Sequence, residues 1–138
     1  MFSKDALKGQ RILVTGGGSG LGKEMSRHFL KFGSEVVICG RRESVLEDTA
    51  KELSDETGGV ITYFPLDIRD SMAIEASVEE LFNEKPLTGL VNNAAGNFIS
   101  RTKDLSPNGF NAIASIVFHG TFYICLLYTS PSPRDSRK

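Results

Sequence analysis

The chain has 138 residues, of which 40% are hydrophobic and 24% are charged. This composition is that of a globular protein rather than a disordered one, and the length suits a single domain. The 16 basic and 17 acidic residues give a net charge of -1, so the protein has no overall positive charge that would attract nucleic acid.

Signals for export and membrane insertion are not expected. Residues 1–8 carry charges where a secretory signal needs an apolar core, and no stretch approaches the roughly 18 apolar residues needed to cross a bilayer. Cys39 and Cys125 lack CxxC spacing, so we interpret them as reduced apolar residues. The sequence therefore predicts a cytoplasmic protein with no membrane, nucleic-acid or metal partner.

Apolar runs alternate with segments of helical periodicity. Residues 11–15 form a short apolar run that ends in glycines, which predicts a buried strand. The next large apolar residues recur at helical spacing up to Gly33, where a helix C-cap belongs: Leu21, Met25, Phe29 and Phe32. The pattern then repeats as a strand at 36–39, a helix ending at Gly58-Gly59, a strand at 60–66, a helix from Asp70 to Lys85 and a strand at 90–93.

The later helices have apolar faces of their own. The inward residues are expected to be Leu46, Ala50 and Leu53 in one helix and Ile74, Val78, Leu81 and Phe82 in the next. A last helix begins around Ser106-Pro107. Because the strands are continuously apolar, the sequence predicts an α/β fold whose parallel sheet has helices on both faces and strand order 3-2-1-4.

The end of the chain departs from this pattern. Residues 126–138 are rich in serine, proline and charge, which indicates a disordered tail after a partial α/β domain at residues 1–125. The change occurs inside a helix that is still burying apolar residues. We therefore hypothesise that the tail is not native coding sequence; a genuine disordered tail is the alternative.

A glycine-rich turn, Thr15–Gly22, lies between the first strand and the first helix. Its spacing is G-x-x-x-G-x-G. Glycines let the backbone approach a diphosphate, and the helix N-terminus supplies unpaired N–H groups and a positive dipole. This arrangement predicts the N-terminal half of a Rossmann-type nucleotide-binding fold, while a turn that binds nothing is the alternative.

The end of the second strand indicates which nicotinamide cofactor fits. An NAD site places a carboxylate there for the ribose 2′-hydroxyl, whereas this chain has Gly40-Arg41-Arg42. Arg41 can pair with a 2′-phosphate through its planar guanidinium. The alternative is ordinary surface charge, although cations oppose the dipole at a helix N-terminus. The sequence therefore favours NADP(H).

Two motifs carry a family resemblance that covers roughly residues 8–125. The glycine turn, followed by Asn92-Asn93-Ala94-Ala95-Gly96, resembles the short-chain dehydrogenase/reductase family. Ala95 and the following Asn97-Phe98, with the segment 105–108, are similar to the 2,4-dienoyl-CoA reductases in particular. The resemblance implies NADPH-dependent reduction of 2,4-dienoyl-CoA in unsaturated fatty-acid degradation, an acyl-CoA substrate and a homotetramer.

The resemblance also assigns roles to individual residues. It implies that the phosphates meet Gly16, Gly17, Gly18, Ser19, Gly20, Leu21 and Arg41, that Asp67 meets the adenine, and that Asn93, Ala94 and Ala95 line the ribose. For Asp67, a turn carboxylate at a strand end is the alternative. In the substrate site, Asn97 would polarise the thioester carbonyl, and Arg69, Phe98 and Ser106 would meet the acyl-CoA.

Two departures from the family pattern are visible. His119 stands where the family usually has an asparagine that holds a water of the proton relay; His119 either takes this role or is an ordinary helix histidine. The family's Tyr-x-x-x-Lys motif does not occur in these 138 residues. We therefore expect no turnover from this chain alone. A different short-chain ketoreductase or alcohol dehydrogenase, and an inactive nucleotide-binding fragment, remain as alternatives.

Overall fold

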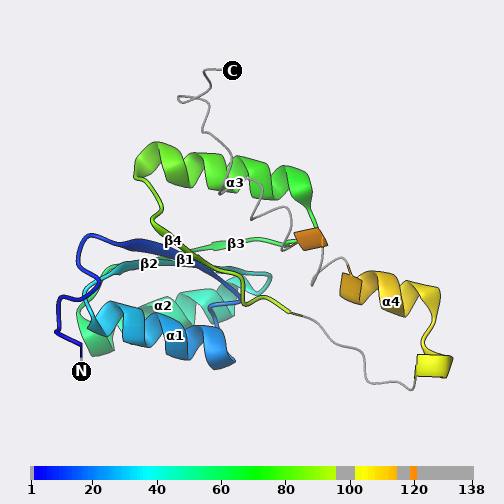
Figure 1. Ribbon diagram of the computed structural model, residues 1–138, viewed down its shortest axis with the longest axis horizontal. Helices are drawn as coiled ribbons and strands as arrows, with labels where there is room; N and C mark the ends of the chain where they lie inside the picture. Colours follow the sequence, from blue (N-terminus) through cyan, green and yellow to red (C-terminus); the bar gives the residue numbers. More distant parts are fainter. Residues whose placement is uncertain (1, 96–101, 115–118, 121–138) are drawn as a thin grey trace.

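The structure, a computed structural model, describes residues 2–95, 102–114 and 119–120. Four parallel strands form one sheet in the order β3-β2-β1-β4 (Figure 1), which confirms the predicted sheet and its strand order. The elements follow the chain as β1 (Arg11–Thr15), α1 (Gly20–Lys31), β2 (Glu35–Gly40), α2 (Glu43–Thr57), β3 (Ile61–Pro65), α3 (Ser71–Glu84), β4 (Gly89–Val91), the 3-10 helix η1 (Thr102–Asp104) and α4 (Pro107–Ala114).

Helices cover both faces of the sheet, as the apolar strands predict. Helices α1 and α2 pack on one face and α3 on the other (Figure 1). Residues on β1 alternate between the two cores: Val14 packs with Leu46 of α2, whereas Leu13 packs with Ile74 of α3. Each fully buried side chain of this size contributes roughly 1.5–3 kcal/mol.

The helix ends follow the capping signals in the sequence. Gly58 closes α2 in the left-handed conformation, with φ +71°. Asp70 caps α3 by accepting from the Ala73 amide at 3.1 Å. The Ser106 hydroxyl likewise accepts from the Gly109 amide at 3.0 Å, just before α4. These caps confirm the predicted starts of α3 and α4 and the predicted end of α2.

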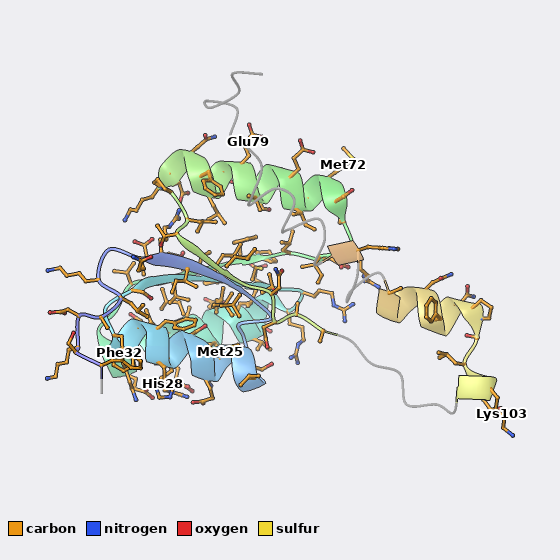
Figure 2. The ribbon with its side chains drawn as sticks, viewed as in Figure 1. Met25, His28, Phe32, Met72, Glu79 and Lys103 are labelled. Carbon is orange, nitrogen blue, oxygen red and sulfur yellow. The ribbon has the colours of Figure 1, made fainter. Side chains whose placement is uncertain are left out.

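The buried face of α1 differs from its row of large apolar residues. Leu21 is 69% exposed, and the buried positions are Gly22, Ser26 and Leu30. Figure 2 shows His28 on the side of α1 that faces away from the sheet. Ser26 tolerates burial because its hydroxyl donates to the Gly22 carbonyl at 2.9 Å. The contact face therefore includes the small residues Gly22 and Ser26, which let the N-terminal half of α1 pack close to the sheet.

The outer face of α3 is exposed. Met72 and Glu79 point away from the sheet (Figure 2), whereas the predicted inward residues Ile74, Val78 and Leu81 are buried. Phe82 is partly buried against the same core.

Among the residues that the structure describes, none of the helices has the length and the hydropathy that crossing a membrane requires.

Other predictions concern the cysteines and the C-terminal segment. Cys39 is buried, and burial raises the pKa of its thiol to about 12, as suits an inert apolar residue. Cys125 and the predicted tail at 126–138 lie outside the described residues, so these predictions stay untested.

Arg11 is a buried charge inside a strand that we interpreted as apolar. Its side chain is 5% exposed. Its guanidinium donates to Glu35 Oε2 at 2.9 Å, the Leu81 carbonyl at 2.8 Å, the Lys85 carbonyl at 2.5 Å and Glu84 Oε2 at 3.2 Å. Because the last turn of α3 has no basic residue, Arg11 supplies the positive charge that favours a helix C-terminus. The network ties β1, β2 and α3 together.

Replacing Arg11 with methionine is expected to lower the free energy of unfolding by about 3 kcal/mol, because Glu35 and the end of α3 lose a buried donor. Denaturant unfolding of the full-length gene product measures this. Lys51→Met is the control, since Lys51 and its partner Asp55 are both exposed and such pairs add little. Equal stability of the two variants would contradict the role given to Arg11.

Candidate functional site

A cleft of about 340 Å³ lies at the carboxyl ends of the strands, where open α/β sheets bind ligands. It joins the glycine turn, the end of β2, the end of β3 and the loop after β4. Eight predicted cofactor residues line it: Gly16, Gly18, Ser19, Arg41, Asp67, Asn93, Ala94 and Ala95. The structure therefore brings together residues that lie up to 79 positions apart in the sequence.

The start of the glycine turn is tied to the neighbouring strands. The Gly16 amide donates to the Cys39 carbonyl at the end of β2, at 2.8 Å. The Asn93 side chain donates to the Gly16 carbonyl at 3.1 Å. Gly16 has φ +66°, a left-handed conformation that favours glycine. The backbone at Gly16 is therefore fixed before the chain enters α1.

The loop after β4 is held by a buried hydroxyl. Thr15 Oγ1 accepts from the Asn93 amide at 3.0 Å and from the Ala94 amide at 2.9 Å. Because of these bonds, β4 ends at Val91, whereas the sequence predicted a strand up to Asn93. The bonds place Asn93 and Ala94 against the glycine turn.

Helix α1 approaches this turn closely because Gly22 has no side chain. A Cβ at Gly22 would lie 2.3 Å from the Gly16 carbonyl oxygen and 2.6 Å from Asn93 Nδ2. The N-cap residue Ser19 forms no capping hydrogen bond through its side chain, and the first turn contains no acidic residue. The N-terminal amides and dipole of α1 thus favour an anion at this point of the cleft.

The end of β2 contributes cations and no carboxylate. Gly40 is its last residue, and Arg41 and Arg42 follow with exposed side chains that line the cleft. Arg42 is the N-cap residue of α2, so both arginines lie where the helix dipole opposes a positive charge. An anionic ligand bound here would offset this unfavourable placement.

Asp67 and Arg69 form an ion pair at the edge of the cleft. Arg69 Nη2 donates to Asp67 Oδ2 at 2.6 Å, and Arg69 Nε donates to Oδ1 at 2.9 Å. These bonds, with a smaller contribution from Arg41, lower the pKa of Asp67 to about 2. Asp67 is therefore an ionised acceptor throughout the neutral range.

Other predicted site residues lie outside the cleft lining. Leu21 is exposed in the first turn of α1, and Ser106 caps α4. Gly17 packs on Ile38, where a Cβ would lie 2.4 Å from Ile38 Cγ2. Gly20, with φ +55°, does not line the cleft either.

His119, Asn97 and Phe98 complete the predicted set. His119 is exposed, and the adjacent Gly120 is buried against Ile68, a lining residue of the cleft. Asn97 and Phe98 lie outside the described residues, so their assignment stays a prediction. Within the described ranges, no group of three or more His, Cys, Asp or Glu side chains could hold a metal ion.

Sequence reasoning missed part of the lining. Val45, Leu46 and Ile68 contribute apolar walls to the cleft, and Arg42 adds a second cation. The sequence predicts only a core position for Leu46 and no role for Val45. Val45 follows the end of β2 by a few residues, in the first turn of α2. Because this turn faces the same edge of the sheet as the end of the strand, the sequence could have indicated that Val45 lines the cleft.

A sequence model of the short chain dehydrogenase family matches residues 10–131. The chain therefore belongs to this family. The peroxisomal 2,4-dienoyl-CoA reductase of Arabidopsis thaliana is 42% identical over 125 residues, which cover 90% of this chain and 42% of that protein. The resemblance to 2,4-dienoyl-CoA reductases is thus confirmed, although the chain spans about two fifths of the length of the curated relatives it matches.

Solved structures agree with the fold. The citronellol catabolism dehydrogenase of Pseudomonas aeruginosa superposes with a TM-score of 0.89 at 32% identity, covering 96% of this chain and 54% of that one. A short chain dehydrogenase from Escherichia coli, crystallised with NADPH, gives a TM-score of 0.86 at 25% identity, covering 91% and 54%.

The Asp67–Arg69 pair has a consequence for pH dependence. Because the pKa of folded Asp67, about 2, lies below its ordinary value of 3.8, the pair stabilises the fold above that value and its contribution is lost as the pH falls through about 2. From about pH 6 to about pH 3, the Asp67 carboxyl carbon should keep its ionised chemical shift in NMR spectra of aspartate-labelled protein.

Removing the partner should change this titration. In Arg69→Met, the midpoint should rise towards 3.8, whereas Lys51→Met should leave it unchanged. A wild-type midpoint close to 3.8, or a midpoint that does not depend on Arg69, would show that the ion pair does not form in solution.

Proposed function

We propose that this chain is the nucleotide-binding part of an NADPH-dependent oxidoreductase that reduces 2,4-dienoyl-CoA thioesters in unsaturated fatty-acid degradation. The observation that carries the cofactor proposal is the single cleft in which the glycine turn and Arg41 meet. The relatives named 2,4-dienoyl-CoA reductase support the substrate proposal.

The cleft suits a dinucleotide with an additional phosphate. The turn at residues 16–21 and the N-terminus of α1 receive the diphosphate, since bare backbone and unpaired amides face it there. Gly40 places no carboxylate against a 2′-phosphate, and the Arg41 guanidinium can bind this group through two parallel hydrogen bonds. A short chain dehydrogenase with a closely similar fold was crystallised with NADPH, which supports a nicotinamide cofactor.

Three further contacts follow from the positions around the cleft. The ionised Asp67 accepts a hydrogen bond from the adenine amino group. Asn93, Ala94 and Ala95 line the ribose, because the bonds to Thr15 hold this loop against the turn. Leu21, exposed at the start of α1, contacts the phosphates as the last residue of the turn at 16–21.

In the proposed reaction, the bound cofactor supplies a hydride to the distal end of the conjugated diene. Negative charge then moves to the thioester oxygen, and a proton adds at Cα. Asn97 donates to that oxygen and stabilises the charge as it develops. Arg69, Phe98 and Ser106 contact the acyl-CoA, and His119, next to the cleft wall, holds a water that takes part in proton transfer.

A second candidate function is supported by the sequence itself. No Tyr-x-x-x-Lys motif occurs in the 138 residues, and neither Tyr123 nor Tyr128 has a lysine four positions later. By itself the chain is then a nucleotide-binding fragment without turnover. A ketoreductase or alcohol dehydrogenase of the same family is the alternative substrate class, because it needs the same cofactor cleft.

Assembly and location are also proposals. We propose a homotetramer from the family resemblance, and an acyl-CoA as the small-molecule partner. A cytoplasmic location is one proposal, while the name of the Arabidopsis relative places that protein in peroxisomes. Fractionation of cells that produce the tagged full-length protein distinguishes the two locations.

Replacing Arg41 with alanine in the full-length gene product should raise the dissociation constant for NADPH by about 10- to 100-fold, because a charge-assisted pair with the 2′-phosphate is lost. The constant for NADH, which lacks that phosphate, should stay the same. Fluorescence titration measures both. Lys51→Ala on α2 is the control, since Lys51 is exposed and pairs only within its helix. Equal losses for both cofactors would exclude Arg41 as the selective group.

The substrate proposal is tested by turnover. The full-length gene product should oxidise NADPH when a 2,4-dienoyl-CoA is added, as followed by the loss of absorbance of the reduced nicotinamide. The 138-residue chain should give no rate above background under the same conditions. If the full-length protein reduces ketones but no dienoyl-CoA, the ketoreductase alternative is correct, and activity of the short chain would contradict the fragment proposal.

A further inference from the structure

Thr49 is a buried polar residue to which the sequence assigned no role. It lies in the second turn of α2 and is 3% exposed. Its hydroxyl donates to the Gly18 carbonyl at 2.6 Å, a contact between residues 31 positions apart. A short, buried hydrogen bond of this kind fixes the orientation of the backbone group that accepts it.

The bond belongs to a contact between α2 and the middle of the glycine turn. A Cβ at Gly18 would lie 3.2 Å from Leu46 Cδ2 and 3.2 Å from Val45 Cγ1, so Gly18 packs directly on this helix. The start of the same turn is held from another direction by Asn93. The turn is therefore held at Gly16 by Asn93 and at Gly18 by Thr49.

Peptide geometry shows what this bond does for the cleft. In a trans peptide the C=O and the N–H of the same plane point in opposite directions. When the Gly18 carbonyl points to Thr49, the Ser19 amide must point away from Thr49. Gly18 and Ser19 both line the cleft, whereas Thr49 does not. The Ser19 N–H thus points away from α2, and Ser19 both lines the cleft and is the N-cap residue of α1.

We infer that Thr49 is a positioning residue for the cofactor diphosphate. It holds the Gly18–Ser19 peptide so that the Ser19 N–H donates to a phosphate oxygen. The inference rests on the proposed function, since it needs a diphosphate in this cleft. The Thr49 bond also connects the diphosphate site with the 2′-phosphate site. Arg41 and Arg42 directly precede α2, the helix that carries Thr49, so α2 sets the distance between the glycine turn and these cations.

The test separates the diphosphate from the 2′-phosphate. NADPH carries both groups, whereas adenosine 2′-monophosphate carries only the second. Dissociation constants for both ligands are measured with the full-length gene product and its variants. Thr49→Val keeps the shape of the side chain and removes the hydroxyl, Thr49→Ser keeps the hydroxyl, and Thr49→Ala is a second hydroxyl-free variant in case valine prevents folding.

Thr57→Val is the matched control. Thr57 lies on the same helix, away from the cleft; its hydroxyl donates to the Leu53 carbonyl at 2.7 Å and accepts from the Gly59 amide at 3.1 Å. Thr57→Val therefore reports the loss of threonine hydrogen bonds from α2 without any change at the glycine turn. Urea unfolding of each variant shows how far stability alone has changed.

Loss of the Thr49 hydroxyl should raise the NADPH dissociation constant about tenfold, because one buried acceptor loses its donor and one phosphate contact loses its direction. The constant for adenosine 2′-monophosphate should stay unchanged. Thr49→Ser should restore NADPH binding, and Thr57→Val should bind both ligands as the wild type does.

Three results would overturn the inference: unchanged NADPH binding in Thr49→Val, equal weakening of both ligands, or no rescue by Thr49→Ser. Failure of the proposed function gives a different pattern. In that case the wild type binds neither ligand, or Arg41→Ala leaves the binding of adenosine 2′-monophosphate unchanged. The inference about Thr49 then falls with it.

Discussion

The rest of the site depends on the close approach of α1 to the end of the sheet. Gly22 leaves no room for a Cβ between α1, the Gly16 carbonyl and the Asn93 side chain. Because the three segments meet there, the helix N-terminus, the glycine turn and the loop after β4 open into one cleft. A side chain at position 22 would separate α1 from the turn, and the N-terminal amides would no longer face the cleft.

Charge in this cleft is arranged to suit a particular anion. The glycine turn offers backbone amides, and Arg41 and Arg42 add cations at a helix end whose dipole opposes them. Asp67, the carboxylate in the lining, stays ionised because Arg69 holds it. In the proposed complex, the diphosphate of the cofactor pairs with the backbone amides, its additional phosphate with the arginines, and its adenine amino group with Asp67. This match is the physical basis for proposing NADP(H).

The sequence predicted the strands, their order, the caps at Gly58, Asp70 and Ser106 and eight of the residues that line the cleft, since these depend on local patterns. Contacts that depend on tertiary distance were not predicted. The small buried residues of α1 cannot be recognised from the spacing of large apolar residues. The burial of Arg11 in an apolar strand is explained only by the carbonyls at the C-terminus of α3, which the fold brings beside it. The Thr49–Gly18 bond was hidden for the same reason.

The most direct measurement is a crystal structure of the full-length gene product grown with NADP⁺. We expect the diphosphate to lie against residues 16–22, with the 2′-phosphate within hydrogen-bonding distance of the Arg41 guanidinium and the adenine beside Asp67. A nucleotide bound away from this cleft, or one whose 2′-phosphate points into solvent with Arg41 turned away, would contradict the proposed cofactor site.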